Sequence, residues 1–379
     1  MAAQIRLPGR AEPLVVPEPG WAATYPPPSS RRVYAAAHVA AAPVTAPRAG
    51  IEIDWEATLR FRDHLWAYGF GVAEAMDTAQ RGMGLSWEQA KELIARTAGR
   101  ARERGGTIAC GVGTDQLADG ESHPVARIIA AYAEQLEAVQ STDAGVILMA
   151  SRALAASASS AQDYLDVYGE LLKQAKRPVI LHWLGEAFDP ALRGYWGSRD
   201  FGAAAGTVLE LIDRAGGQVD GIKLSVLDAG QEVALRRRLP RGVRLYTGDD
   251  FNYAELIRGD EAGHSDALLG AFAAITAPAA AALHALDDGD IAGYDAAMEP
   301  TIPLSRLIFE PHTPYYKVGV AFLAWLNGLQ PRLEMLGGLH RNRPAGHLIR
   351  VFELAAGARA LTDPELAVEQ IREFLGTLT

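Results

Sequence analysis

The chain has 379 residues, of which 49% are hydrophobic, so it can bury a large core. Its formal net charge of −10 argues against a nucleic-acid surface, and no Lys/Arg run suggests an anionic membrane patch. The single cysteine, Cys110, fits a reducing cytoplasm, and no apolar stretch reaches the roughly 18 residues of a membrane span, so we expect a cytoplasmic protein without a membrane partner.

The start of the chain differs in composition from the rest. Residues 1–30 contain seven prolines and no apolar signal core, so we expect an extended arm and not a targeting segment. Short apolar runs and amphipathic stretches alternate after this arm. Asp54 can cap a first helix, Ser86 opens a capping box with Gln89, and Pro124 suits the first turn of a later helix.

Eight short segments rich in aliphatic and β-branched residues have the pattern of buried strands. They are residues 32–38, 71–76, 107–112, 145–149, 178–185, 219–226, 243–250 and 266–271. Strands that alternate with helices at a spacing of roughly 35 residues predict an α/β fold, a (β/α)8 TIM barrel. We expect an N-terminal arm (1–30), the barrel (31–277) and a C-terminal helical region packed on the barrel (278–379).

In such barrels the reactive side chains lie at the carboxyl ends of the strands, around one mouth. The residues at these positions that can carry chemistry are His38, Asp77, Thr78, Cys110 or Thr114, Ser151, His182, Lys223, and Asp249 or Asp250. This set is typical of an enzyme. Because no glycine-rich phosphate loop follows a strand, we expect no nucleotide cofactor.

Lys223 is the candidate nucleophile, because it interrupts an apolar strand. Only five of the 36 basic residues are lysines, so the chain uses arginine wherever any cation suffices. An ionised lysine in a buried strand is costly to desolvate, so we expect a lowered pKa and a neutral, nucleophilic amine. The alternative is a structural ion pair with Asp249 or Asp250.

Other candidates lie on neighbouring strands. His182 lies on the strand that comes immediately before the strand of Lys223. Its imidazole can move protons in both directions if it titrates near neutral pH. A metal ligand and a core histidine are the alternatives for His182. We expect one of Asp249 and Asp250 to cap the following helix and the other to face the mouth. Arg152 either clamps an anionic group bidentately or lies on the surface.

The segment Pro178–Asp250 resembles the dihydrodipicolinate synthase / N-acetylneuraminate lyase superfamily of class I aldolases. Three motifs in order carry this resemblance: Gly221-Ile222-Lys223, Gly248-Asp249-Asp250, and Glu310 to Lys317 for the family's Glu-Pro-x-x-x-x-Lys, with one residue more. The similarity extends more faintly from about residue 31 to 330. It implies that Lys223 forms a Schiff base and that the protein is a homodimer or homotetramer.

The chain departs from this family where the family binds pyruvate and relays protons. The family's tyrosine on the strand before the lysine falls at His182. Its Gly-Thr-Thr-Gly-Glu loop corresponds to Asp77-Thr78-Ala79-Gln80-Arg81, and its Pro-Tyr-Tyr becomes Ser151-Arg152-Ala153. We therefore expect a divergent branch that acts on a keto acid or an oxidised sugar-derived carbonyl compound.

These features predict a Schiff-base-forming lyase, aldolase or dehydratase, with Lys223 as nucleophile, His182 as proton carrier and no cofactor. The side chains expected to hold the substrate are His38, Asp77, Thr78, Arg152, Asp249 and Asp250. One alternative is a divalent-metal sugar isomerase or aldolase that uses the same histidines and aspartates, and another is a non-catalytic sugar-binding barrel. The aromatic and Arg-containing loop 186–201 is expected to be a lid, a sugar-stacking surface or an oligomer contact.

Overall fold

The computed structural model describes residues 3–43, 52–118 and 120–378. Eight parallel strands close into a barrel in the order β10-β3-β4-β5-β6-β7-β8-β9. They are β3 (Val33–Ala36), β4 (Gly71–Glu74), β5 (Ile108–Val112), β6 (Gly145–Leu148), β7 (Val179–Leu184), β8 (Val219–Ser225), β9 (Arg244–Thr247) and β10 (Asp266–Leu269). The predicted TIM barrel with a C-terminal helical region is confirmed.

The chain forms two compact units. The strand unit comprises residues 71–77 and 81–269, and the helical unit comprises residues 1–70, 78–80 and 270–379. The bounds expected from the sequence for the arm, the barrel and the helical region stay a prediction.

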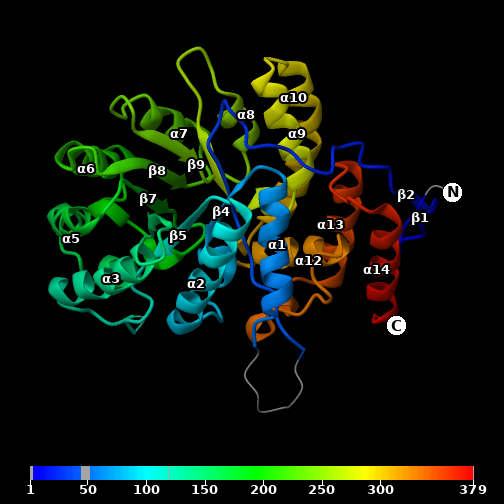
Figure 1. Cartoon of the computed structure of the whole chain (residues 1–379), viewed down its shortest axis with the longest axis horizontal. Helices are drawn as coiled ribbons and strands as arrows, with labels where there is room; N and C mark the ends of the chain where they lie inside the picture. Colours follow the sequence, from blue (N-terminus) through cyan, green and yellow to red (C-terminus); the bar gives the residue numbers. More distant parts are fainter. Residues whose placement is uncertain (1–2, 44–51, 119, 379) are drawn as a thin grey trace. The chain divides into compact units, whose positions relative to one another are not determined.

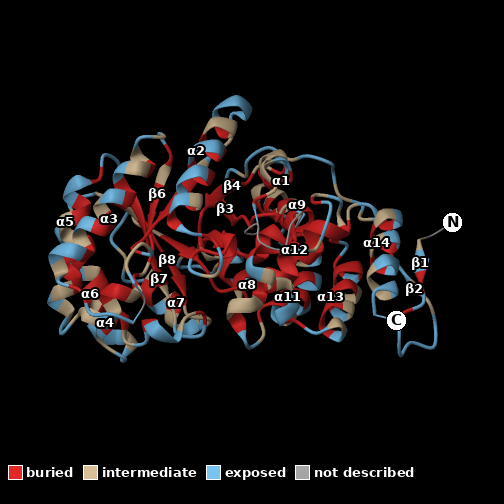
Figure 2. Ribbon diagram, turned by 90° about the horizontal axis from the view of Figure 1, so that it is seen from below, coloured by how far each residue is buried: buried red, intermediate tan, exposed pale blue. Residues whose placement is uncertain are grey.

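The strand unit holds β4 to β10, with helices outside the strands (Figure 1). These helices are α2 (Trp87–Arg104), α3 (Val125–Gln140), α4 (Arg152–Ser157), α5 (Ala161–Gln174), α6 (Phe201–Arg214), α7 (Ala229–Arg236) and α8 (Tyr253–Arg258). The strands are buried, whereas α3, α5 and α6 expose their outer faces (Figure 2). Helix α2 begins at the predicted capping box, in which the Ser86 and Gln89 side chains each accept the other's backbone N–H.

Strands β7, β8 and β9 pair so that one row of side chains crosses all three. His182 pairs with Lys223, and Lys223 pairs with Tyr246. Both β7 and β8 lie within the ranges expected from the sequence, 178–185 and 219–226. Val179 pairs with Val219 whereas Ile180 pairs with Gly221, so β8 carries one extra residue, Asp220.

The helical unit is built around α12 (Tyr316–Leu326), which is buried at every position. Its other helices are α1 (Trp55–Ala67), α9 (Thr276–Asp287), α10 (Ile291–Met298), α11 (Ile302–Ile308), α13 (Ala345–Gly357) and α14 (Pro364–Gly376). The arm forms a small antiparallel pair, β1 (Gln4–Ile5) and β2 (Leu14–Val15). Among the described residues, no helix combines the length and apolar composition that a membrane span requires.

Candidate active site

Lys223 is a buried lysine in the middle of the strand unit, with 5% of its surface exposed. Burial lowers its pKa, and the negative charges of Asp77 and Asp250 act in the opposite direction. Asp77 lies three residues after the end of β4 at Glu74, and Asp250 lies three residues after the end of β9 at Thr247. The structure therefore brings together three residues that the sequence placed at different strand ends.

His182 lies beside Lys223, as its register partner on β7. Burial and, to a smaller extent, the positive charge of Lys223 lower the pKa of His182 to about 3, and the charge of Asp77 opposes both effects. The expectation that this imidazole titrates near neutral pH is therefore wrong, because water does not reach it. A neutral imidazole can still donate a proton from one ring nitrogen and accept one at the other.

Ser225 is a site residue that the sequence analysis missed. Its Oγ lies 3.3 Å from His182 Nε2, and it is buried. Within the described part of the chain, His182 Nδ1 has no hydrogen-bond partner. Ser225 follows Lys223 by two residues on β8, and residues two apart on a strand share a face. Strand periodicity alone could have identified it.

Because Gly248 has no side chain, Lys223 and Ser225 can occupy the space beside it. A Cβ at this position would lie 2.1 Å from Ser225 Oγ and 2.9 Å from Lys223 Cε, and 2.9 Å from the Leu224 carbonyl oxygen. Side chains of β8 at residues 223 and 225 thus face the end of β9, where Asp249 and Asp250 follow. Only glycine fits here without displacing the lysine.

The two aspartates after β9 have different surroundings. Asp249 Oδ1 accepts the backbone N–H groups of Phe251 at 2.9 Å and Asn252 at 3.0 Å, and its Oδ2 accepts the Asn252 side-chain amide at 2.8 Å. It therefore holds the turn that leads into α8. Asp250 is 3% exposed, and its charge acts on Lys223. Substrate binding by either residue stays a prediction.

Arg152 forms an ion pair in the strand unit, with its Nε 2.5 Å from Asp189 Oδ2. The Arg152 side chain is 37% exposed. Its partner Asp189 belongs to the loop that follows β7 and also accepts the backbone N–H of Ala191. A role for Arg152 in binding an anionic substrate group stays a prediction, since its guanidinium already has a carboxylate partner.

The loop 186–201 is anchored by aromatic side chains. Tyr195 and Trp196 are buried, and the Trp196 ring lies 4.6 Å from that of Tyr168 on α5. The Tyr195 hydroxyl accepts the backbone N–H of Ser151 at 2.9 Å. Ser151 Oγ in turn lies 2.6 Å from Thr114 Oγ1. This loop thus fixes two hydroxyl groups at the carboxyl ends of β5 and β6.

The remaining two candidates lie in the helical unit. His38 Nε2 is 2.6 Å from Gln330 Oε1, and burial lowers the His38 pKa to about 4. Thr78 Oγ1 lies 2.6 Å from the Tyr316 hydroxyl, and both residues are buried. No local pattern in the sequence marks these partners, because each is more than two hundred residues away. Their roles in substrate binding stay predictions.

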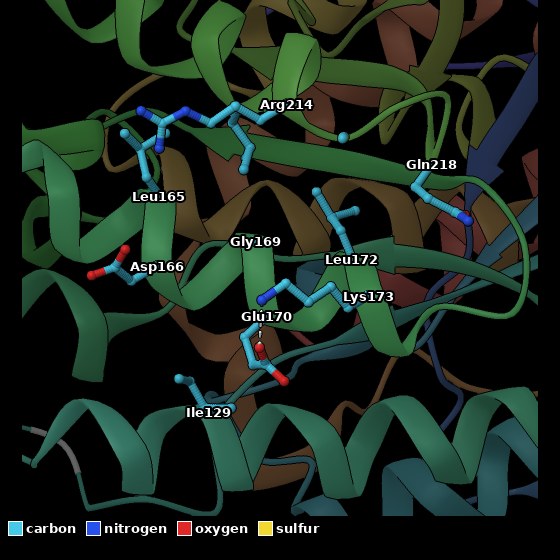
Figure 3. A pocket seen from close by; sticks show the side chains of 11 residues that line it. Ile129, Leu165, Asp166, Gly169, Glu170, Leu172, Lys173, Arg214 and Gln218 are labelled. Atoms are coloured by element: carbon cyan, nitrogen blue, oxygen red, sulfur yellow. Dashed lines mark hydrogen bonds and ion pairs between the residues drawn. The ribbon is translucent and has the colours of Figure 1, made fainter.

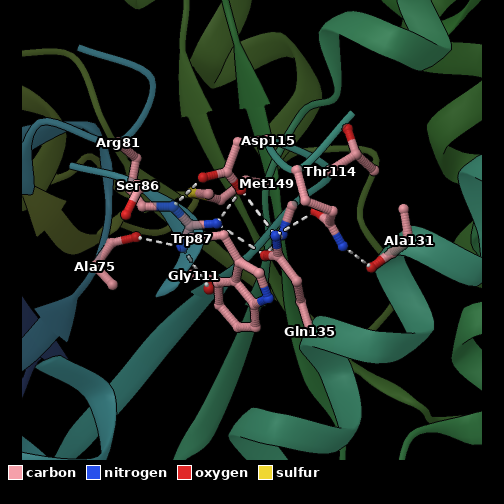
Figure 4. A network of polar contacts seen from close by, with 12 residues as sticks. Ala75, Arg81, Ser86, Trp87, Gly111, Thr114, Asp115, Ala131, Gln135 and Met149 are labelled. Atoms are coloured by element: carbon pink, nitrogen blue, oxygen red, sulfur yellow. Dashed lines mark hydrogen bonds and ion pairs between the residues drawn. The ribbon is translucent and has the colours of Figure 1, made fainter. Parts of the chain in front are cut away.

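Arg81 is the centre of a buried polar network (Figure 4). Its Nε donates to Asp115 Oδ2 at 2.8 Å, and its Nη2 donates to Asp115 Oδ1 and, at 2.8 Å, to Gln135 Oε1. Its Nη1 donates to the carbonyl oxygens of Ala75 at 3.2 Å and Gly111 at 3.3 Å. Although burial opposes it, Arg81 lowers the pKa of Asp115. The network ties the carboxyl ends of β4 and β5 together.

A family model described as a protein of unknown function, DUF993, matches residues 10–378. The chain belongs to this family. No curated protein sequence matches the DUF993 chain.

Solved structures of the dihydrodipicolinate synthase family resemble the DUF993 chain in fold. The Aquifex aeolicus synthase has a TM-score of 0.67 at 13% identity, over 87% of this chain and 99% of its own. The Oceanobacillus iheyensis synthase has a TM-score of 0.64 at 15% identity, over 86% and 95%. YagE of E. coli K12, a member of that family in complex with pyruvate, has a TM-score of 0.67 at 14% identity, over 87% and 99%. The resemblance expected from the sequence is confirmed for the fold.

A groove of about 570 Å³ lies on the outside of the DUF993 strand unit, between α3, α5 and α6 (Figure 3). Leu165 and Leu211 line it, and so do Glu170 and Lys173, which form an ion pair with 3.0 Å between Lys173 Nζ and Glu170 Oε2. Arg214 and Gln218 place it near the start of β8, at the amino end of the strands. The reactive residues of a barrel lie at the other end. Among the described residues, no three His, Cys, Asp or Glu side chains gather as a metal-binding cluster.

Proposed function

We propose that this DUF993 protein is a class I aldolase-type lyase, in which Lys223 forms a Schiff base with a carbonyl substrate. The observation that carries the proposal is the setting of Lys223: it is buried, its pKa is lowered, and His182, Ser225, Asp77 and Asp250 surround it. The fold of the dihydrodipicolinate synthase family supports it, as does YagE, which was solved with the keto acid pyruvate.

A lowered pKa increases the share of the neutral amine, which is the form that nucleophilic attack requires. In the proposed reaction, the Lys223 Nζ lone pair attacks the substrate carbonyl carbon, and loss of water gives a protonated iminium. The bond between the α- and β-carbons of the substrate then breaks: the β-hydroxyl group loses its proton and leaves as a carbonyl compound, and the electron pair of the broken bond moves into the iminium to give an enamine. Protonation of the enamine carbon and hydrolysis release the second product and free Lys223. Asp77 and Asp250 stabilise the cationic iminium, because each places a negative charge beside it.

His182 and Ser225 are proposed to carry the proton that this step releases. The imidazole is neutral over the physiological pH range, because its pKa is lowered to about 3. It therefore relays a proton between its two nitrogens and does not store one as imidazolium. Ser225 Oγ, at 3.3 Å from Nε2, extends the relay along β8.

Borohydride trapping tests the nucleophile. The protein is incubated with a panel of keto acids and keto sugars, reduced, digested and mapped by mass spectrometry. We expect a stable adduct on Lys223 and none on Lys317, the other buried lysine, whose Nζ donates to the Pro314 carbonyl oxygen at 2.9 Å. Lys223→Ala is expected to abolish turnover and the adduct.

The matched control is Lys173→Ala, which removes an exposed lysine from α5. Its adduct yield is expected to equal that of the wild type. A folded Lys223→Ala protein with full activity, or an adduct confined to other lysines, would refute the Schiff-base mechanism. We further propose a cytoplasmic homodimer or homotetramer, for which sedimentation of the purified protein is the direct measurement.

A further inference from the structure

We propose that the substrate of this site is an uncharged, hydroxylated carbonyl compound, such as a hydroxyketone or a neutral sugar, and not an α-keto acid. The inference rests on the proposed Schiff-base function and narrows its substrate class. It rests on two observations: the negative charges that surround Lys223, and the arginines of the strand unit that already have carboxylate partners.

The first step is the charge balance at Lys223. Asp77 and Asp250 both act on the lysine, and Asp250 is 3% exposed, so water screens it little. An iminium at Lys223 carries one positive charge, and the two carboxylates carry two negative ones. An uncharged carbonyl compound leaves the group with a net charge of −1. An α-keto acid adds a third carboxylate directly beside the reacting carbon and raises the excess negative charge to −2.

The second step concerns the cations that could compensate such a carboxylate. Arg81 and Arg152 are the arginines that follow β4 and β6 most closely. The Arg81 guanidinium donates hydrogen bonds to Asp115, Gln135 and two backbone carbonyl oxygens. Arg152 is paired with Asp189 at 2.5 Å. In the described strand unit, neither arginine is left to bind a substrate carboxylate bidentately without breaking an ion pair.

The third step is the supply of hydroxyl-binding groups at the same strand ends. Ser225 Oγ stands on the face of β8 that carries Lys223. Thr114 and Ser151 place a hydroxyl pair, 2.6 Å apart, at the ends of β5 and β6. Hydroxyls such as these donate and accept hydrogen bonds, whereas the ionised Asp77 and Asp250 only accept them, so the two aspartates bind the hydroxyl groups of a sugar and not a substrate carboxylate, which has no proton to offer.

Two three-carbon ketones of matched size test this inference. Pyruvate and hydroxyacetone differ only in a carboxylate against a hydroxymethyl group. Each is incubated with the full-length protein and borohydride, and the rate of adduct formation on Lys223 is measured by mass spectrometry. Each rate is divided by the rate of the same ketone with N-α-acetyl-lysine, which removes the difference in intrinsic reactivity. We expect the corrected rate to favour hydroxyacetone by at least about tenfold.

Asp250→Asn tests whether electrostatic repulsion causes the preference for hydroxyacetone, since the substitution removes one negative charge beside Lys223. We expect it to reduce the preference for hydroxyacetone at least about threefold, and Asp77→Asn serves the same purpose if the first variant does not fold. Asp213→Asn, an exposed change on α6, is the matched control and is expected to keep the wild-type preference.

The outcomes separate the two proposals. An adduct on Lys223 that forms equally well or better with pyruvate overturns this inference and leaves the Schiff-base function standing. A preference for hydroxyacetone that both aspartate variants retain in full overturns the electrostatic explanation on which the inference is built. No adduct with either ketone overturns the proposed function and this inference with it.

Discussion

Glu232 on α7 offers the most quantitative test of the structure. The residue is 1% exposed, and its carboxyl group accepts hydrogen bonds from Thr247 Oγ1 at 3.0 Å and Ser265 Oγ at 2.7 Å. Burial raises the pKa of Glu232 to about 8, from an ordinary value of 4.5. The two hydroxyls and Arg236 lower it, and the charge of Asp249 raises it. The helix is therefore fastened to β9 through a carboxyl group that is protonated at neutral pH.

The sign of the resulting pH dependence follows from proton binding. Between pH 4.5 and 8 the folded protein holds the Glu232 proton, and the unfolded chain has released it. The contribution of this proton to the free energy of unfolding is complete below pH 4.5 and is lost as the pH rises to 8. A pKa difference of about 3.5 corresponds to about 5 kcal/mol over the whole window.

Glu232→Gln keeps the shape and the hydrogen bonds of the protonated acid and removes its titration. We expect urea unfolding, followed by circular dichroism, to show the variant close to the wild type at pH 5. At pH 8.5 the variant should be more stable by several kcal/mol. Glu255→Gln removes an exposed carboxylate from α8 and should follow the wild type at every pH. Wild-type and Glu232→Gln curves that stay parallel from pH 5 to 8.5 would refute this explanation.

Two further substitutions test the site and its support. Gly248→Ala places a Cβ 2.1 Å from Ser225 Oγ and 2.9 Å from Lys223 Cε, so we expect borohydride trapping at Lys223 to fall at least about tenfold. Gly206→Ala in α6, where a Cβ meets no atom within 4 Å, is its control, and equal trapping in both variants would contradict the packing argument. Arg81→Met takes the cation from Asp115, whose side chain is 21% exposed, and removes the donor of the Ala75 and Gly111 carbonyl oxygens, so we expect it to lower the free energy of unfolding by about 2–4 kcal/mol. A change below about 1 kcal/mol in urea unfolding would show that Arg81 adds no stability.

Local signals in the sequence were sufficient for most elements of the barrel. Asp54 caps α1 through its side chain, and Ser86 and Gln89 form the expected box at α2. The apolar runs became strands, because a strand covered on both faces needs an unbroken apolar pattern. The ends differ by a residue or two: β8 ends at Ser225, the last residue that pairs with β7, and not at the expected Val226.

Partners that are distant along the chain could not be predicted from the sequence. Asp115 and Gln135 are 34 and 54 residues from Arg81, and no local pattern marks one network. The pKa of His182 depends in the same way on burial, which sequence position does not fix. Asp77, Asp249 and Asp250 follow their strands as the sequence indicated, whereas His182 and Lys223 lie inside theirs, and the pairing and protonation of all five required the three-dimensional structure.

The extra residue in β8 decides which way the lysine faces. Pairing shifts at Asp220, between Val219 and Gly221, and every later side chain of the strand alternates from that point. Deleting Asp220 would either pull Val219 out of register or turn Lys223 toward the outer helices. A lineage of such barrels can therefore gain or lose its internal amine through the insertion or loss of a single codon.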